Sequence, residues 1–263
     1  MITRLKLLLI VREVTSHMPR VRGLGRILAL IARAFRRHDL PDVEVSVFGR
    51  NMLLSPNDAI GNYLIFTPQW YDFRERRLIR KILNRGDYVI DVGANIGTYS
   101  LIFADLVGSS GKVTAIEAEQ KNARRLKHNL ETNDIGWVED RNFGVSDKEE
   151  RLSLLLNDDG NAGAHSFYRQ ANASLLRTQE IQCLPLSSLI DGSRKPRLMK
   201  LDIEGFEWRV LRKYFEDVPN QLWPTFIMLE DDSRHRESDA VPMLLSHGYS
   251  FVNRFGANVF MVR

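Results

Sequence analysis

The residues best suited to bind a ligand lie in the segment Asp91-Val-Gly-Ala-Asn-Ile-Gly97. The apolar run at 88–92 predicts a buried strand that ends in a carboxylate, and a helical pattern begins at Thr98. A strand, a tight turn and a helix N-terminus form the ligand-binding corner of open α/β sheets, and glycine lets the backbone approach a ligand without a Cβ. We therefore predict a cofactor site formed by Asp91, Gly93, Ala94, Asn95, Gly97 and Thr98.

The details of this turn favour one cofactor over another. A dinucleotide site requires G-x-G-x-x-G, but here Asn95 takes the second glycine position and Gly97 comes one residue early. This difference argues against a pyrophosphate and therefore against a nicotinamide dehydrogenase. Asp91 can accept hydrogen bonds from an ammonium group, which suits S-adenosyl-L-methionine, a cationic cofactor with an amino-acid tail. A tight turn without a ligand is the alternative.

Two further residues follow the next two predicted strands. Glu117 ends the strand at 112–117, 26 residues after Asp91, where a carboxylate can accept both hydroxyls of a ribose. The alternative is a solvent-facing Glu that opens the following helix. Asn142 comes just after the third strand and is predicted to contact adenine.

Candidate catalytic residues lie in Lys200-Leu-Asp202-Ile-Glu204. Alternation along a strand places Asp202 and Glu204 on one face, at the sheet edge where open α/β sheets bind ligands. Either carboxylate can act as a general base, and Asp202 can also bind an acceptor hydroxyl. His165, in a predicted loop, titrates near neutral pH and is a third candidate base. The alternatives are a structural Lys200–Asp202 ion pair, a helix cap at Glu204 and an exposed loop histidine. No metal site is predicted, although these acids and Glu230 are oxygen ligands.

The surrounding elements predict the fold class. Strands are expected at 88–92, 112–117, 138–142, 197–203 and 225–230, alternating with helices at 98–107, 120–132, 206–216 and 239–247. Two closing strands at 249–253 and 258–262 predict a hairpin. Alternating βα units form a parallel sheet that is covered on both faces. We predict an α/β, Rossmann-like fold: a seven-stranded, mostly parallel sheet with helices on both faces and a C-terminal antiparallel hairpin.

Three segments lie outside this alternation. Residues 43–48 and 52–54 predict a hairpin with its turn at 49–51, and residues 71–84 predict a helix. The excursion at 143–190 is predicted to contain strands within 145–156. Its turn-rich part at 157–163 is predicted to admit or cover a substrate.

Charge and composition separate the N-terminus from the rest. The 263 residues are 44% hydrophobic and carry a net charge of +4, which is typical of a globular chain. Residues 1–38 hold nine Lys or Arg and one Glu, a net charge of +8 (9 − 1), which leaves −4 (4 − 8) for the remainder. The single Cys183 excludes internal disulfides and a multi-thiolate zinc site. We expect a helical extension at 1–40 and one domain at 41–263.

The extension contains a basic amphipathic helix, with apolar residues at helical spacing from Leu24 to Phe35 and arginines between them. It is expected either to dock on its own domain or to contact an anionic membrane or an acidic partner. No apolar run approaches the ~20 residues that span a bilayer. The expected location is cytoplasmic, with peripheral contact at the inner membrane face as an option.

The order of these motifs resembles the FkbM family of methyltransferases. The resemblance covers roughly residues 60–255 and is carried by Asp91-Val-Gly-Ala-Asn-Ile-Gly97, Glu117, Leu184-Pro-Leu-Ser-Ser-Leu189, Met199-Lys-Leu-Asp-Ile-Glu-Gly205 and Ile227-Met-Leu-Glu230. It implies methyl transfer from S-adenosyl-L-methionine, usually to oxygen, on sugars or secondary metabolites. Ser187 and Ser188 stand where the family tends to carry an acidic pair, so this chain lacks those two carboxylates.

Two other functions remain as alternatives. A nucleic-acid methyltransferase is suggested by the sequence pI of 9.2, but the basic charge is confined to the N-terminus. The motif around Asp202 also lacks the Pro-Pro-aromatic sequence usual for base-amino methylation. We therefore expect a small-molecule or glycan acceptor and no nucleic acid. The other alternative is a non-catalytic membrane- or partner-binding module on a vestigial methyltransferase fold.

Overall fold

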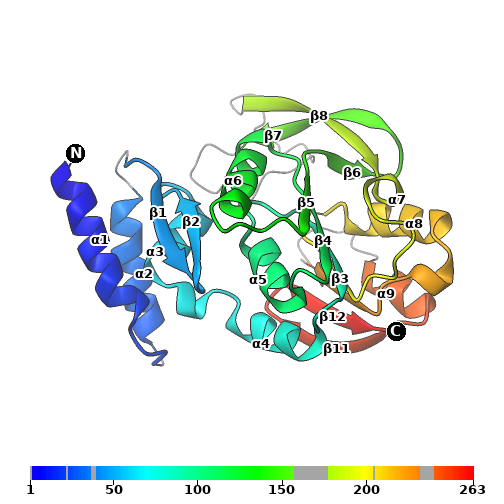
Figure 1. The fold of residues 1–263 in the computed structure, drawn as a ribbon, viewed down its shortest axis with the longest axis horizontal. Helices are drawn as coiled ribbons and strands as arrows, with labels where there is room; N and C mark the ends of the chain where they lie inside the picture. The colour runs from blue at the N-terminus through cyan, green and yellow to red at the C-terminus, as the bar shows by residue number, and fades with distance from the viewer. Residues whose placement is uncertain (1, 22, 37–39, 157–176, 204, 232–239) are drawn as a thin grey trace.

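The computed structural model describes residues 2–21, 23–36, 40–156, 177–203, 205–231 and 240–263 (Figure 1). Its centre is a seven-stranded sheet in the order β11-β12-β10-β9-β3-β4-β5, in which β12 runs antiparallel to both neighbours. The strands are β3 (Tyr88–Val92), β4 (Lys112–Ile116), β5 (Val138–Arg141), β9 (Leu198–Leu201), β10 (Phe226–Glu230), β11 (Ser250–Phe255) and β12 (Asn258–Val262). The predicted sheet and its C-terminal antiparallel pair are confirmed.

Helices cover both faces of this sheet, because successive strand residues point to opposite sides. Val89 packs into one apolar cluster with α4 (Phe73–Ile82), α5 (Thr98–Val107) and α6 (Gln120–Glu131). Its neighbour Ile90 packs into a second cluster with α7 (Leu186–Leu189), α8 (Glu207–Asp217) and α9 (Ala240–Ser246). Strand β3 is buried at every position, as a central parallel strand requires.

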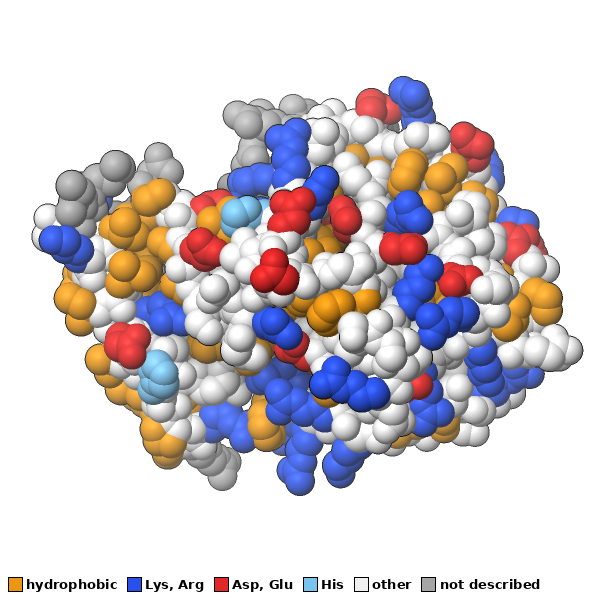
Figure 2. All heavy atoms as spheres, viewed as in Figure 1, with side chains coloured by type: hydrophobic (Ala, Val, Ile, Leu, Met, Phe, Trp, Pro, Cys, Tyr) orange, Lys and Arg blue, Asp and Glu red, His pale blue; other side chains and the backbone are white. Residues whose placement is uncertain are grey.

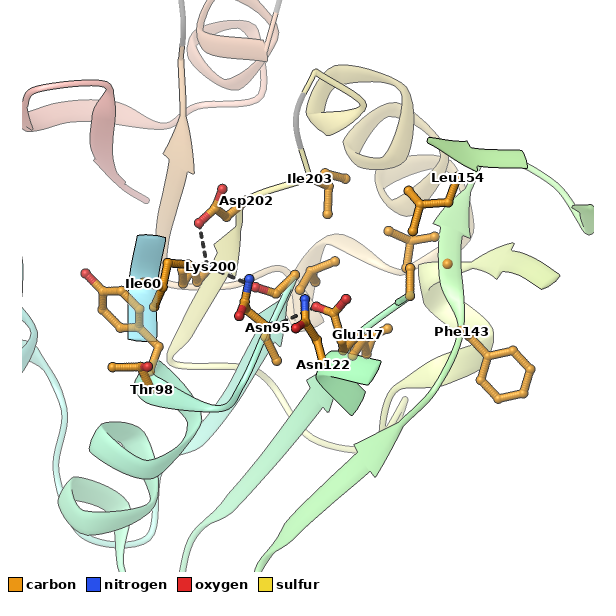
Figure 3. Close-up of a pocket in the computed structure, with 18 of the residues that line it drawn as sticks. Ile60, Asn95, Thr98, Glu117, Asn122, Phe143, Leu154, Lys200, Asp202 and Ile203 are labelled. Carbon is orange, nitrogen blue, oxygen red and sulfur yellow. Dashed lines mark hydrogen bonds and ion pairs between the residues drawn. The ribbon is translucent and has the colours of Figure 1, made fainter. Parts of the chain in front are cut away.

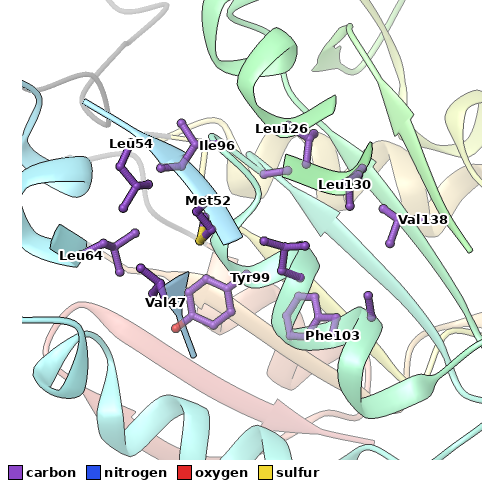
Figure 4. Packing of buried hydrophobic residues seen from close by; sticks show 14 of the residues in the cluster. Val47, Met52, Leu54, Leu64, Ile96, Tyr99, Phe103, Leu126, Leu130 and Val138 are labelled. Atoms are coloured by element: carbon purple, nitrogen blue, oxygen red, sulfur yellow. The ribbon is translucent and has the colours of Figure 1, made fainter. Parts of the chain in front are cut away.

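The N-terminal part continues the first cluster (Figure 4). It consists of α1 (Ile2–Ser16), α2 (Leu24–Phe35), β1 (Val43–Val47), β2 (Arg50–Leu54), α3 (Ala59–Phe66) and the 3₁₀ helix η1 (Pro68–Trp70). Met52 of β2 and Leu64 of α3 lie in the same core as Phe103 and Leu126. This packing fixes the hairpin and α3 beside the main sheet.

Two details of this part differ from the sequence expectation. The hairpin turns at Phe48 and Gly49, whose φ angles are 53° and 86°, and not at 49–51. A two-residue turn with positive φ at both positions matches the twist of the strands, so the pairing starts at Arg50. Within the helical extension expected at 1–40, the sequence located a helix only between Leu24 and Phe35, and α1 is a second helix there. Leu8 on its inner face is buried in the core.

A separate three-stranded sheet lies within the excursion at 143–190 (Figure 1). Its strands are β6 (Gly144–Ser146), β7 (Glu150–Leu156) and β8 (Arg177–Pro185), in the order β6-β8-β7. The expected turn-rich segment at 157–163 lies outside the described residues. Among the helices that are described, none is both long enough and apolar enough to cross a membrane.

Candidate active site

A pocket opens at the carboxyl ends of β3, β4 and β9 (Figure 3). Its floor is the turn between β3 and α5, and Glu117 and Lys200 enter from the two neighbouring strands. Ile60 of α3 and Leu154 of β7 complete the wall, so the N-terminal part and the excursion both contribute. The pocket therefore lies where open α/β sheets bind their ligands.

The turn adopts left-handed backbone angles, with φ of 75° at Gly93, 52° at Asn95 and 89° at Gly97. A Cβ at Gly93 would lie 2.0 Å from the carbonyl oxygen of Asp202, and one at Gly97 would lie 2.6 Å from Cδ1 of Leu126. Both glycines thus make room for other parts of the chain. From the sequence, these glycines are predicted to make room for a ligand, but in the structure a side chain at either position would clash with the protein itself.

Asp91 lies beneath this turn and is fully buried. Its Oδ2 accepts a hydrogen bond of 2.6 Å from the Ser100 hydroxyl, and its Oδ1 lies 3.7 Å from Nζ of Lys200. Asp91 is not among the residues that line the pocket. The ammonium group nearest to it therefore comes from the protein itself. Burial raises the pKa of Asp91 more than Lys200 and Ser100 lower it.

Lys200 joins Asp91 to the pocket. Its Nζ lies 3.1 Å from Oδ2 of Asp202 and 5.3 Å from the ring centroid of Tyr99. Burial lowers the pKa of Lys200, but the carboxylates of Asp202 and Asp91 outweigh burial, and the net direction is upward. The Lys200–Asp202 ion pair, one of the sequence alternatives, is present. Because 41% of the Asp202 side chain is still exposed, that carboxylate remains open to a ligand.

Glu117 faces Lys200 and Asp202 across the pocket (Figure 3). Its two oxygens accept hydrogen bonds from the backbone N–H groups of Asn95, at 2.7 Å, and Glu119, at 2.8 Å. Burial, which those two bonds only partly offset, raises the pKa of Glu117 to about 7. Each carboxylate oxygen has a second lone pair, so Glu117 can still accept ligand hydroxyls.

The pocket also holds a buried polar atom that lacks a partner. Oγ1 of Thr98, at the start of α5, has no hydrogen-bond partner among the described residues and lines the cavity. A ligand donor or acceptor would satisfy it. The enclosed volume is about 110 Å³, whereas ligand pockets usually measure about 300 Å³ or more. A nucleoside-sized ligand would therefore extend from the cavity toward its mouth.

A family comparison identifies the domain that forms this pocket. A model of the methyltransferase FkbM domain matches residues 91–251, more than half of the chain. The chain belongs to this family. The match runs from Asp91 through Glu117 and Asp202, so it contains the pocket's main charged residues. The resemblance found in the sequence is confirmed.

Several solved structures are similar to this chain at low sequence identity. Methyltransferase FkbM from Methylobacillus flagellatus is 16% identical with a TM-score of 0.49, over 78% of this chain and 52% of that one. This chain thus spans about half the length of that relative. An S-adenosylmethionine-dependent O-methyltransferase from Thermotoga maritima is 16% identical with a TM-score of 0.43, over 72% and 64% of the two chains. TYW2 from M. jannaschii, solved with AdoMet, is 13% identical with a TM-score of 0.45, over 86% and 85%. No curated protein matches the chain.

The remaining predicted residues of this FkbM domain are placed as follows. The Asn142 amide donates hydrogen bonds of 2.9 and 3.1 Å to the carbonyl oxygens of Glu117 and Ala118, and the neighbouring Phe143, not Asn142, lines the pocket. Glu204 and His165 lie outside the described residues. Within the part that is described, no group of three His, Cys, Asp or Glu side chains could hold a metal ion.

One residue that the sequence analysis missed holds the loop after β9. Glu207 is buried, and its two oxygens accept hydrogen bonds from the N–H groups of Ile203, at 3.0 Å, and Gly205, at 2.9 Å. Burial raises the pKa of Glu207 to about 7. The sequence signal was an acid in the first turn of a helix, two residues after a glycine. The sequence pattern instead suggested Glu204 as a helix cap.

Proposed function

We propose that this chain transfers a methyl group from S-adenosyl-L-methionine to a hydroxyl group of a sugar, a glycan or a small secondary metabolite. Family membership supports methyl transfer as the reaction class. The observation that carries the proposal is the placement of two carboxylates, Glu117 and Asp202, on opposite sides of one pocket at the sheet edge.

Glu117 and Thr98 are the residues that would hold the cofactor. The Glu117 carboxylate can accept the two ribose hydroxyls, and the unpartnered hydroxyl of Thr98 can take up a further hydrogen bond. When bound, the cofactor supplies a methyl group that its positively charged sulfur has already activated. Asp91 acts in this proposal through Lys200, whose position it fixes, and not by direct contact.

Asp202 is the residue that would orient the acceptor. Its partly exposed carboxylate can accept a hydrogen bond from a hydroxyl and remove its proton during transfer. Lys200 holds this carboxylate in place at 3.1 Å, and Glu207 holds the following loop. Positioning of this kind lowers the barrier by aligning the reacting atoms beforehand.

The charge around the pocket supports a small acceptor over RNA. Glu117 and Asp202 line the pocket, and Lys200 is the only Lys or Arg among its described lining residues. Asp91 and the more distant Asp72 add further negative charge around that cation. A phosphate backbone entering this mouth would meet like charge. The open pocket lined by both Glu117 and Asp202 also favours a catalytic domain over a vestigial, non-catalytic fold.

Binding of S-adenosylhomocysteine, measured by calorimetry on the purified chain, tests the cofactor. Glu117→Ala should weaken that binding by about 1–3 kcal/mol, because a charged hydrogen bond is lost. The control Glu131→Ala, at the exposed end of α6, should bind as the wild type does. Absence of both heat and thermal stabilisation at millimolar ligand would contradict the proposal.

Transfer of a radiolabelled methyl group to a panel of glycosides, phenols and RNA tests the acceptor class. Asp202→Asn should keep the affinity for S-adenosylhomocysteine and lower the rate of labelling of a hydroxyl acceptor. Asp140→Asn, the same change at an exposed position of β5, is the matched control. Labelling of RNA alone would favour the nucleic-acid alternative.

A further inference from the structure

The N-terminal helices expose a large share of the molecule's apolar surface. Among the described residues, eight of the twelve exposed large hydrophobic side chains lie between positions 7 and 31: Leu7, Leu9, Ile10, Val14, Val21, Ile27, Leu30 and Ile31. Figure 2 shows apolar side chains gathered on the side where α1 and α2 lie in Figure 1. A concentration of this kind marks an interaction surface, whereas scattered apolar residues do not.

Both helices are anchored by their other faces. Leu8 of α1 and Leu28 and Ala32 of α2 are buried against the domain. Ile10 and Val14 lie one turn apart on the outward side of α1, and Ile27 and Leu30 do so on α2. The exposed apolar face, defined here by these four outward residues, thus belongs to folded helices that are fixed to the core.

A basic groove adjoins this face. It has a volume of about 820 Å³ and runs between α1, the β1–β2 hairpin and α4. Its cations are Arg12, Arg20, Arg76, Arg77, Arg80 and Lys81, and Glu13 is the only acid among its described lining residues. The groove and the apolar face meet on α1, where Glu13 and His17 lie one turn beyond Ile10 and Val14.

Some of these cations make contacts that hold the fold together, and others do not. The buried guanidinium of Arg76 donates a hydrogen bond of 2.7 Å to the carbonyl of Tyr71 and stacks on Phe48. Arg77, Arg80 and Lys81 are exposed on α4 and form no ion pair with any described residue. In Figure 2, basic side chains gather in the region that α4 occupies in Figure 1. These three side chains are available for an anionic ligand.

We propose that the exposed apolar face and the basic groove bind the protein to an anionic lipid surface. The four apolar side chains enter the boundary between headgroups and acyl chains, while Arg77, Arg80 and Lys81 bind lipid phosphates. Charge complementarity supports this occupant, because six Lys or Arg and one Glu are the charged side chains among the groove's described lining residues. The proposal is independent of methyl transfer.

Other occupants fit the same surface less well. A second copy of the chain would place the same face against itself in a symmetric dimer, and the two basic grooves would repel each other. A nucleic acid would use the groove but would leave the apolar side chains of α1 and α2 in water. A lipid surface satisfies both features at once.

Co-sedimentation of the full chain with vesicles tests the proposal. The protein should pellet with vesicles that contain phosphatidylglycerol, pellet far less with pure phosphatidylcholine, and bind less as salt increases. Ile10→Asp/Leu30→Asp should weaken partitioning to the vesicles at least tenfold, because two apolar side chains would no longer insert into the lipid. Arg80→Glu/Lys81→Glu should weaken it at least tenfold through loss of charge attraction.

Matched controls separate this surface from general effects. Leu245→Asp changes an apolar residue on α9 that is 52% exposed, against 63% for Ile10 and 66% for Leu30. Arg124→Glu/Lys127→Glu makes the same charge change at exposed positions of α6. Both should partition as the wild type does, and circular dichroism should show all variants folded.

Three results would overturn the proposal. The first is equal pelleting of the protein with the two vesicle types, or control variants that lose as much vesicle partitioning as the surface variants do. The second is binding of single-stranded RNA that the groove variant abolishes and the apolar variant leaves intact, without vesicle binding. The third is a wild-type dimer in analytical ultracentrifugation that Ile10→Asp/Leu30→Asp converts to monomer.

Discussion

Replacing Glu117 by Gln should change how the stability of the protein depends on pH. Burial of this carboxyl raises its pKa from 4.5 in the unfolded chain to about 7 in the folded protein. The folded state therefore holds the proton more tightly than the unfolded state does. Glu117 contributes stability that is fully present below pH 4.5 and is lost as the pH rises through 7.

The size of this effect follows from the shift. A difference of one pKa unit corresponds to about 1.4 kcal/mol, so the shift of Glu117 changes the free energy of unfolding by about 3 kcal/mol over its full pH range. About 2 kcal/mol of this change falls between pH 5 and pH 8. Glutamine carries no charge at either pH. Relative to the wild type, Glu117→Gln should thus gain about 2 kcal/mol of unfolding free energy between pH 5 and pH 8.

Urea unfolding of both proteins at pH 5 and pH 8 measures this double difference. Loss of hydrogen bonds from Asn95 and Glu119 affects the variant at both pH values and cancels in the comparison. Glu131→Gln, at a side chain that is 66% exposed, supplies the background for the same substitution on a hydrated carboxylate. The reasoning fails if the wild type and Glu117→Gln differ by the same amount at both pH values, or if the variant loses relative stability at pH 8.

Two further substitutions test the structural basis of the site. Gly93→Ala should lower the free energy of unfolding in urea by about 2–4 kcal/mol. The new Cβ would lie 2.0 Å from the Asp202 carbonyl oxygen, and the φ of +75° is strained for alanine. A loss below about 0.5 kcal/mol would contradict this and show that the turn can adjust to the side chain. Lys200→Met should cost about 3–5 kcal/mol because it leaves Asp91 buried without its cation. The double variant Lys200→Met/Asp91→Asn should recover part of that loss, and no recovery would assign the cost to packing.

The sequence could predict much of the fold because its main signals are local. The alternation of apolar strands and helices gave the seven-stranded sheet, and the helix pattern from Thr98 to Val107 matches α5 residue for residue. The turn at Gly93 and Gly97 was also found, since glycines between a strand and a helix indicate left-handed backbone. Within the extension at 1–40, α1 could not be located from the sequence, because the apolar run at 7–11 is continuous and lacks the spacing of one helix face.

The candidate site was predicted in part, and the differences come from long-range contacts. The sequence placed Glu117 and Asp202 at strand ends, and the structure brings both to one pocket. It also treated Asp91 as open to a ligand. The parallel register between β3 and β9 instead sets Asp91 directly beside Lys200, 109 residues later, and buries both.

The sequence alone therefore determined the order of the elements, the family and the strand ends where chemistry can occur, because period and turn chemistry depend on near neighbours. Only the tertiary structure decided which of those polar groups face a ligand and which neutralise each other. It also decided which apolar residues of α1 and α2 pack into the core and which are exposed to solvent. Such pairings depend on register and packing between segments far apart in the chain, which no local pattern records.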